Sequence, residues 1–168
     1  MSVHDGIEAT RLGYHAVPAR VQFGWVDTYG MLWHGHALSY FEQARADIVR
    51  KFDLPAHKLF DLGMAVPMVD LDVRYVSPAR DDDELEIRIS LLKPRLPLPY
   101  LLFEYRIHRV EDGAEVLRGR TRQMVIRNDG RVLIRLPKEV RTCLDAIWAY
   151  LDTCPRWDDE DGAVGKQG

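Results

Sequence analysis

The hydrophobic period of the chain changes twice and divides it into elements. Residues 17–23 have the pattern of a strand, and the stretch 24–35 that follows combines turn residues with bulky apolar ones. From residue 37 to about residue 52, apolar side chains recur at helical spacing, which predicts a helix of about four turns. A second, short helix is predicted at residues 55–62, because Pro55 suits an early helical position.

After the second helix the pattern becomes two-fold. Alternating apolar and polar residues predict strands at residues 69–75, 85–91, 101–107 and 116–127, and a short fifth strand at 132–136. An amphipathic helix at residues 138–151 ends the pattern. Consecutive strands joined by short turns favour an antiparallel sheet with helices on one face, which is an α+β fold. The glycine-rich motifs of phosphate-binding parallel folds are missing from the sequence.

The chain of 168 residues is long enough for one domain that buries its core without disulfides or metals. We assign this domain to residues 17–152. The preceding residues 1–16 show no periodicity and are expected to form an N-terminal tail. Residues 153–168 contain four consecutive acidic residues, Asp158 to Asp161, and are expected to form an acidic C-terminal tail.

The net charge, the hydropathy and the cysteines of the chain argue against several kinds of partner and cofactor. The net charge of -3 gives no electrostatic reason to expect nucleic acid. No apolar run approaches the roughly 20 residues of a spanning helix, so we expect no membrane insertion, and the N-terminus lacks the pattern of a secretion signal. Cys143 and Cys154 have no Cys or His at ligand spacing, so we expect no metal, no cofactor and no disulfide framework, and a reducing cytoplasm is the default compartment.

Asp27 is the residue with the clearest chemical context. It lies between the first strand and the long helix, among aromatic and aliphatic residues from Trp25 to His34. A carboxylate that apolar walls partly desolvate is a stronger base and nucleophile, and a helix start offers backbone N–H groups to a developing oxyanion. These are the two halves of an acyl-transfer site. The alternative is that Asp27 is a turn residue and His34 an ordinary loop histidine.

Three further groups of charged residues have both a structural and a functional interpretation. Arg45 falls within the apolar stripe of the long helix and needs a partner such as Glu42, for packing or subunit contact rather than catalysis. Basic side chains share one face of the predicted sheet: Arg88, Arg106, His108, Arg118, Arg120 and Arg122. This face is either a solvated surface or a binding surface for an anionic nucleotide tail. The proline-rich segment 93–99 is either a stiff surface loop or a contact to phosphates.

A specific resemblance begins at Phe23 and extends to Arg45. The segment reads FGWVDTYGMLWHGHALSYFEQAR, and it resembles the signature of the hotdog-fold acyl-CoA thioesterases, with the 4-hydroxybenzoyl-CoA thioesterase family as the closest branch. The pattern is an aspartate, six residues, a histidine, and then F-E-x-A-R. The resemblance continues through the segments 75–80, 82–83, 85–87 and 136–137, so it covers roughly residues 17–140. It implies a hotdog fold, in which a curved antiparallel β-sheet is wrapped around a long central α-helix.

The resemblance also implies roles for individual residues. Asp27 resembles the catalytic carboxylate, which attacks the thioester or activates water, and His34 falls where the helix start presents an N–H group to the thioester oxygen. The residues expected to bind the substrate are Trp25, Tyr29, Gly30, Met31, Trp33 and Gly35. Those expected to contact coenzyme A are Ser77, Arg80 and Arg95. Active sites of the family lie at a homodimer interface, so a homo-oligomer, dimer or tetramer, is implied.

The chain departs from the family pattern at three places. Phe23 stands where some bacterial members have tyrosine, Trp25 stands where many have an acidic residue, and the proline-rich segment replaces a Gly/Ser-containing connection. The bulky residues around Asp27 predict a hydrophobic or aromatic acyl group. We therefore expect a cytoplasmic acyl-CoA thioesterase that releases a free acid and coenzyme A. The alternatives are a thioesterase acting on acyl carrier protein, a hotdog dehydratase, and a non-catalytic binder of acyl thioesters.

Overall fold

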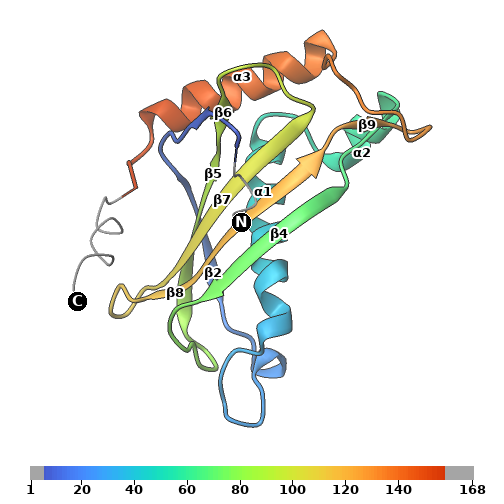
Figure 1. The fold of residues 1–168 in the computed structure, drawn as a ribbon. Helices are drawn as coiled ribbons and strands as arrows, with labels where there is room; N and C mark the ends of the chain where they lie inside the picture. Colours follow the sequence, from blue (N-terminus) through green and yellow to red (C-terminus); the bar gives the residue numbers. More distant parts are fainter. Residues whose placement is uncertain (1–5, 158–168) are drawn as a thin grey trace.

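A five-stranded antiparallel sheet is the main feature of the computed structural model, which describes residues 6–157 (Figure 1). The strand order is β2-β5-β7-β8-β4. The bounds of these strands are His15–Arg20 for β2, Glu84–Leu91 for β5, Tyr100–Arg109 for β7, Glu115–Met124 for β8 and Met68–Tyr75 for β4. Because β4 is at one end of this order, one of its edges has no strand beside it among the described residues. The predicted antiparallel sheet is confirmed.

Helix α1, Ala37–Lys51, lies behind the sheet in Figure 1, and its apolar stripe packs into the concave side. Helix α3, Lys138–Thr153, and the short helix α2, Ala56–Asp61, both lie at the upper end of the molecule in Figure 1. The buried residues of α1 are Ala37, Tyr40, Phe41, Ala44 and Ile48. The predicted long helix and the α+β class are therefore confirmed.

Phe41 of α1 and Tyr105 of β7 form the centre of the core. Their rings stack with centroids 4.3 Å apart and planes 17° apart, and both side chains are buried. Gly119 of β8 lies opposite Tyr105 in the strand register. A Cβ atom on Gly119 would lie 2.3 Å from the Phe41 ring, so a glycine is needed for the helix to approach the sheet this closely.

The structure corrects several strand boundaries. The first long strand ends at Arg20 rather than residue 23, and Phe23–Trp25 forms a 3-10 turn, η1. The predicted strand 116–127 is interrupted at Val125, and its last two residues form β9, Ile126–Arg127, which pairs with β3, Met64–Ala65. The predicted strand 132–136 does not form; Val132 makes only an isolated bridge to Ile126. Alternation reports which residues share a face, but the partner strands decide where pairing stops.

The expectation that residues 1–16 form an unstructured N-terminal tail is wrong for the second half of this segment. Strand β1, Ala9–Thr10, pairs with β6, Lys93–Pro94, and residues from His15 onward belong to β2. The polar pattern of the segment hid these backbone pairings, which depend on a strand about 84 residues away. At the other end, Trp157 is buried against Tyr14, with ring centroids 5.4 Å apart. Residues 158–168 of the expected acidic tail lie outside the described residues. No helix within residues 6–157 is long and apolar enough to cross a membrane.

Candidate active site

The segment between η1 and α1 folds into a tight turn that presents Asp27. The amide of Asp27 donates to the carbonyl of Met31 (2.8 Å), and Gly30 donates back to the carbonyl of Asp27 (2.9 Å). Gly30 has a φ of 70°, which a residue with a side chain rarely adopts. An antiparallel bridge between Val26 and Leu32 closes the base of this turn. The sequence therefore folds locally around Gly30, which the resemblance had implied as a substrate contact.

The two carboxylate oxygens of Asp27 have different surroundings. Oδ1 accepts hydrogen bonds from the amides of Tyr29 (2.8 Å) and Met31 (3.3 Å). Oδ2 accepts no hydrogen bond from any described residue. One oxygen thus fixes the side chain by an Asx-type turn, and the other remains available to a substrate or a water molecule. Both interpretations of Asp27 made from sequence, as a turn residue and as a chemical group, are compatible with this geometry.

The start of α1 supplies the second half of the site. A short 3-10 turn, η2 (His34–His36), leads directly into the 15-residue helix. The amide of His36 donates to the carbonyl of Trp33 (3.0 Å), whereas the amides of His34 and Gly35 donate to no acceptor within the described chain. Two unused N–H groups at the positive end of a helix dipole suit the oxyanion of an acyl-transfer reaction.

Contacts from the sheet hold this turn and helix start in place. The hydroxyl of Tyr75, the last residue of β4, donates to the carbonyl of His34 (2.7 Å), and burial raises the pKa of Tyr75. The amide of Leu32 donates to the carbonyl of Ala79 (2.7 Å), and Met31 forms a bridge with Arg80. The position of Asp27 therefore depends on the segment that links β4 to β5.

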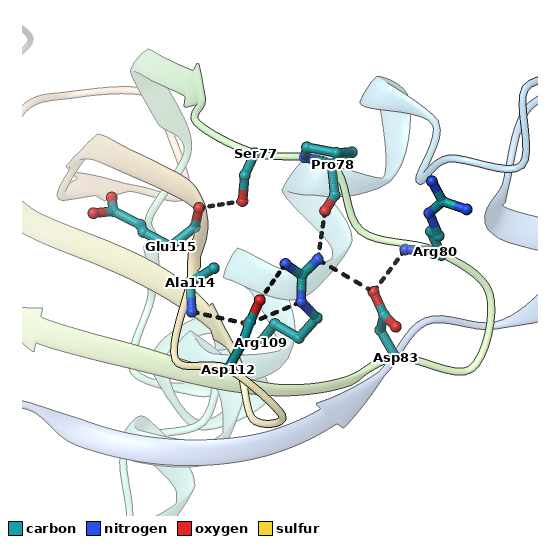
Figure 2. Close-up of polar contacts among 8 residues, drawn as sticks. All are labelled: Ser77, Pro78, Arg80, Asp83, Arg109, Asp112, Ala114 and Glu115. Atoms are coloured by element: carbon teal, nitrogen blue, oxygen red, sulfur yellow. Dashed lines mark hydrogen bonds and ion pairs between the residues drawn. The ribbon is translucent and has the colours of Figure 1, made fainter.

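That linking segment is itself fixed by Arg109, the last residue of β7 (Figure 2). Its guanidinium donates to the carbonyl of Pro78 (2.8 Å) and binds Asp112 with two hydrogen bonds of 3.0 and 2.7 Å. Its distance to Asp83 is 3.7 Å, and Asp83 accepts a hydrogen bond from the amide of Arg80 (2.8 Å). These bonds connect the end of β7 to the residues that pair with the Asp27 turn.

Sequence reasoning missed the parts played by Tyr75, Ala79 and Arg109. Tyr75 and Ala79 fall in a segment that shares the family resemblance, which was the available signal. Arg109 gave no signal, because its contacts to Pro78 and Asp83 arise only when the β7–β8 hairpin meets the β4–β5 connection.

The aromatic residues around Asp27 fall into a packed group and an exposed group. Trp25 stacks on His36, with centroids 4.4 Å apart and planes 6° apart, and meets the edge of Tyr40. Burial raises the pKa of Tyr40 to about 12. Trp33 lies against His34 with centroids 4.9 Å apart, and Tyr29 is 82% exposed. The exposed members leave a large apolar surface beside the carboxylate.

The three residues expected to contact coenzyme A are in different situations. The hydroxyl of Ser77 donates to the carbonyl of Glu115 (2.6 Å), as Figure 2 shows, so it supports the loop. The guanidinium of Arg80 has no ion pair with any described residue and lies next to the turn. Arg95 pairs with Glu8 at 2.8 Å, in the loop after β6 at the opposite end of the molecule from the Asp27 turn in Figure 1. One chain therefore brings Arg80, but not Arg95, close to Asp27.

The other charged groups are largely paired. Arg45 forms an ion pair with Glu42, as expected, and both line a cleft of about 310 Å³ between α1, α2 and the sheet. The basic face of the sheet carries ion pairs to carboxylates, namely Arg88–Glu86, Arg118–Glu115, Arg120–Glu104 and Arg122–Asp70. Burial, and then the charge of Arg88, lowers the pKa of His108 on this face. No three His, Cys, Asp or Glu residues within residues 6–157 form a group that could hold a metal ion.

A curved antiparallel sheet around one long helix, with the Asp27 turn leading into the start of that helix, is the arrangement of a hotdog-type fold. Residues 21–144 match the family model of the thioesterase-like superfamily. The chain belongs to this superfamily, which confirms the hotdog fold and the prediction of a thioester hydrolase.

Individual relatives agree with this assignment. The Escherichia coli protein YbgC, named an acyl-CoA thioester hydrolase, is 31% identical over 104 residues, which cover 60% of this chain and 76% of YbgC. The solved structure of a hypothetical protein from Aquifex aeolicus is 28% identical, with a TM-score of 0.69 over 77% of this chain and 98% of that one. A DHNA-CoA thioesterase from Staphylococcus aureus shares the fold, with a TM-score of 0.71, 20% identity, and coverage of 81% of this chain and 91% of that one.

Proposed function

We propose that this protein hydrolyses acyl-CoA thioesters at Asp27, as a member of the 4-hydroxybenzoyl-CoA thioesterase branch of the superfamily. Water and the thioester give a free acid and the thiol of coenzyme A. The observation that carries the proposal is the free Oδ2 atom of Asp27 close in sequence to the two unused amides of His34 and Gly35. The amides bind the developing oxyanion, and Asp27 attacks the carbonyl carbon or takes a proton from the attacking water.

The acyl group is hydrophobic or aromatic. The turn carries Trp25, Tyr29, Met31 and Trp33, and pockets for such groups are lined mainly by apolar side chains. Arg80 is suited to a phosphate of coenzyme A, because its guanidinium forms no ion pair with a described residue. Relatives named acyl-CoA thioester hydrolases support the coenzyme A substrate. Both cysteines are free thiols, as suits the cytoplasm.

The active form is a homodimer that pairs through β4. This edge strand has eight residues and no proline, and it exposes Val69, Leu71 and Tyr75. A long apolar edge invites another strand, whereas β2, at the other end of the sheet, contains Pro18.

This dimer would also complete the acyl site. Antiparallel pairing of two β4 strands about their centres places the end that carries Tyr75 beside the start, Met68, of the other strand. Tyr75 holds the Asp27 turn through His34, and Ala65 and Val66, just before β4, line the 310 Å³ cleft. The turn of one subunit then faces the cleft of its partner, which receives the acyl group.

Asp27→Asn tests the chemistry directly. The asparagine keeps an oxygen acceptor for the amide of Tyr29, so the turn should hold, but it is neither a base nor a nucleophile of comparable strength. We expect thiol release from acyl-CoAs of two to sixteen carbons, benzoyl-CoA and phenylacetyl-CoA to fall at least 100-fold. The matched control is Asp53→Asn, the same change at an exposed carboxylate beyond the other end of α1, which should leave turnover unchanged.

Unchanged turnover in Asp27→Asn would refute the assignment of Asp27. Wild-type protein that binds acyl-CoAs but hydrolyses none would favour the acyl-carrier-protein substrate or a non-catalytic binder. Hydration of crotonyl-CoA would indicate the dehydratase. Preference for acetyl-CoA would contradict the hydrophobic acyl group.

A further inference from the structure

A second, larger groove lies between α3 and the proline-rich segment that joins β6 to β7. Its volume is about 700 Å³, within the usual range of small-molecule sites. Its walls are formed by the segment from Leu91 to Leu101, the residues just before α3, and one face of α3. None of its lining residues belongs to the Asp27 turn, and Figure 1 shows α3 and β6 at the opposite end of α1 from that turn.

The floor of this groove is apolar. Leu101 and Leu144 are buried, and Leu98, Leu136 and Trp148 are partly exposed along it. The floor thus suits a hydrocarbon chain.

The rim of the groove is basic. Lys93, Arg95, Arg135 and Arg141 line it, against a single carboxylate, Asp145. Arg95 pairs with Glu8, but the side chains of Lys93, Arg135 and Arg141 form no ion pair with a carboxylate in residues 6–157. The Lys93 ammonium lies over the Trp148 ring, 5.8 Å from its centroid. In a chain of net charge -3, this concentration of unpaired cations around an apolar floor is a local feature.

We propose that this groove binds an amphipathic carboxylate, a hydrocarbon chain that ends in one carboxylate group. The chain lies along Leu101, Leu144 and Trp148, and the carboxylate pairs with Arg135 and Arg141. A neutral chain would leave the cations unused, and a small anion would leave the floor unused. The ligand class is also the product class of the proposed thioesterase. The groove shares Leu91, Leu101 and Leu144 with the 310 Å³ cleft, but Arg135, Arg141 and Trp148 line only the groove and lie outside the Asp27 turn.

Binding of dodecanoate to the full-length protein, measured by calorimetry below its micellar concentration, tests this site. The double variant Arg135→Gln/Arg141→Gln should bind dodecanoate at least tenfold more weakly, because the charge-assisted hydrogen bonds to the carboxylate are removed. The control is Arg131→Gln/Arg156→Gln, which removes the same charge from two exposed arginines outside the groove and should bind as the wild type does. Dodecanol should bind more weakly than dodecanoate.

Contact with the floor is measured separately. A brominated dodecanoate should quench tryptophan fluorescence in the wild type, and Trp148→Phe should lose most of this quenching. The proposal is overturned if dodecanoate does not bind, if dodecanol binds equally well, or if Arg135→Gln/Arg141→Gln binds dodecanoate as the wild type does. Turnover of acyl-CoA should be unchanged in the groove variants, so loss of groove binding and loss of the proposed activity are separate results.

Discussion

At the scale of single residues, the candidate site depends on side chains that use their hydrogen-bonding groups unequally. Asp27 commits one oxygen to its own turn and keeps the other free. Arg109 commits its guanidinium to Asp112, Asp83 and the carbonyl of Pro78, and takes no part in the chemistry itself. The first residue could react with substrate, whereas the second positions the segment against which the turn is paired.

Asp112 should make the stability of this region depend on pH. Hydrogen bonds from Arg109 and from the amide of Ala114 lower the pKa of Asp112 to about 2. Because the folded pKa lies below the ordinary value of 3.8, the stabilisation is present above about pH 4 and is lost as the pH falls toward 2. Asp112→Asn should therefore melt at a lower temperature than the wild type at pH 7, and the difference should shrink between pH 4 and pH 2.5.

Glu111→Gln is the matched control, because Glu111 is an exposed neighbour in the same turn. It should give a difference from the wild type that is small and nearly independent of pH. A melting difference for Asp112→Asn that stayed constant from pH 7 to pH 2.5 would show that the Arg109 pair does not stabilise the fold.

At the scale of elements, the close packing of α1 on β8 places the helix start beside the end of β4. Phe41 reaches the sheet because Gly119 has no side chain. A helix held at this depth brings the carbonyl of His34 within 2.7 Å of the Tyr75 hydroxyl. The contact that builds the core therefore also places the amides that we propose to bind the oxyanion.

Gly119→Ala should destabilise the protein. The new methyl would lie 2.3 Å from the Phe41 ring and 3.1 Å from the carbonyl of Asp72. The Phe41 ring is fully buried, so it has no space into which it could move. Overpacking of this kind costs about 1–3 kcal/mol, which urea unfolding would measure as a lower midpoint. Gly24→Ala is the control, because a Cβ atom there meets nothing within 4 Å. Equal midpoints for the two variants would contradict the packing argument.

At the scale of the whole molecule, many of the exposed apolar side chains lie in two neighbouring places. They lie on the Asp27 turn and along the free edge of β4 with the residue that follows it: Phe23, Tyr29, Met31, Trp33, Val69, Leu71, Tyr75 and Val76. A second copy of the chain that covers β4 would bury part of this surface and bring a cleft to each turn.

Leu71→Lys should therefore weaken the proposed dimer. Leu71 lies near the middle of β4 and is 43% exposed, so a lysine there would face its own copy across the two-fold axis. We expect sedimentation to shift from a dimer toward the 19.4 kDa monomer, with a parallel loss of turnover. Ala16→Lys places the same charge on β2, at the other edge of the sheet, and should leave the mass unchanged. If the Leu71→Lys protein sedimented as the same oligomer as the wild type, the β4 interface would be excluded.

The sequence by itself determined the elements whose periodicity is local. The helical spacing from residue 37 onward predicted α1, and alternation predicted β4, β5, β7 and most of β8. It also determined the Asp27 turn, because Asp27 and Gly30 carry their own conformational preferences and the motif around them is contiguous in the chain.

Only the tertiary structure decided which distant segments meet. The pairing of Ala9–Thr10 with Lys93–Pro94, and the support that Arg109 gives to the Asp27 turn through Pro78, join residues that share no local pattern. The groove beside α3 likewise gathers cations from three separate segments. Periodicity records which face a residue presents, but a contact between segments depends on the register and packing of the complete fold.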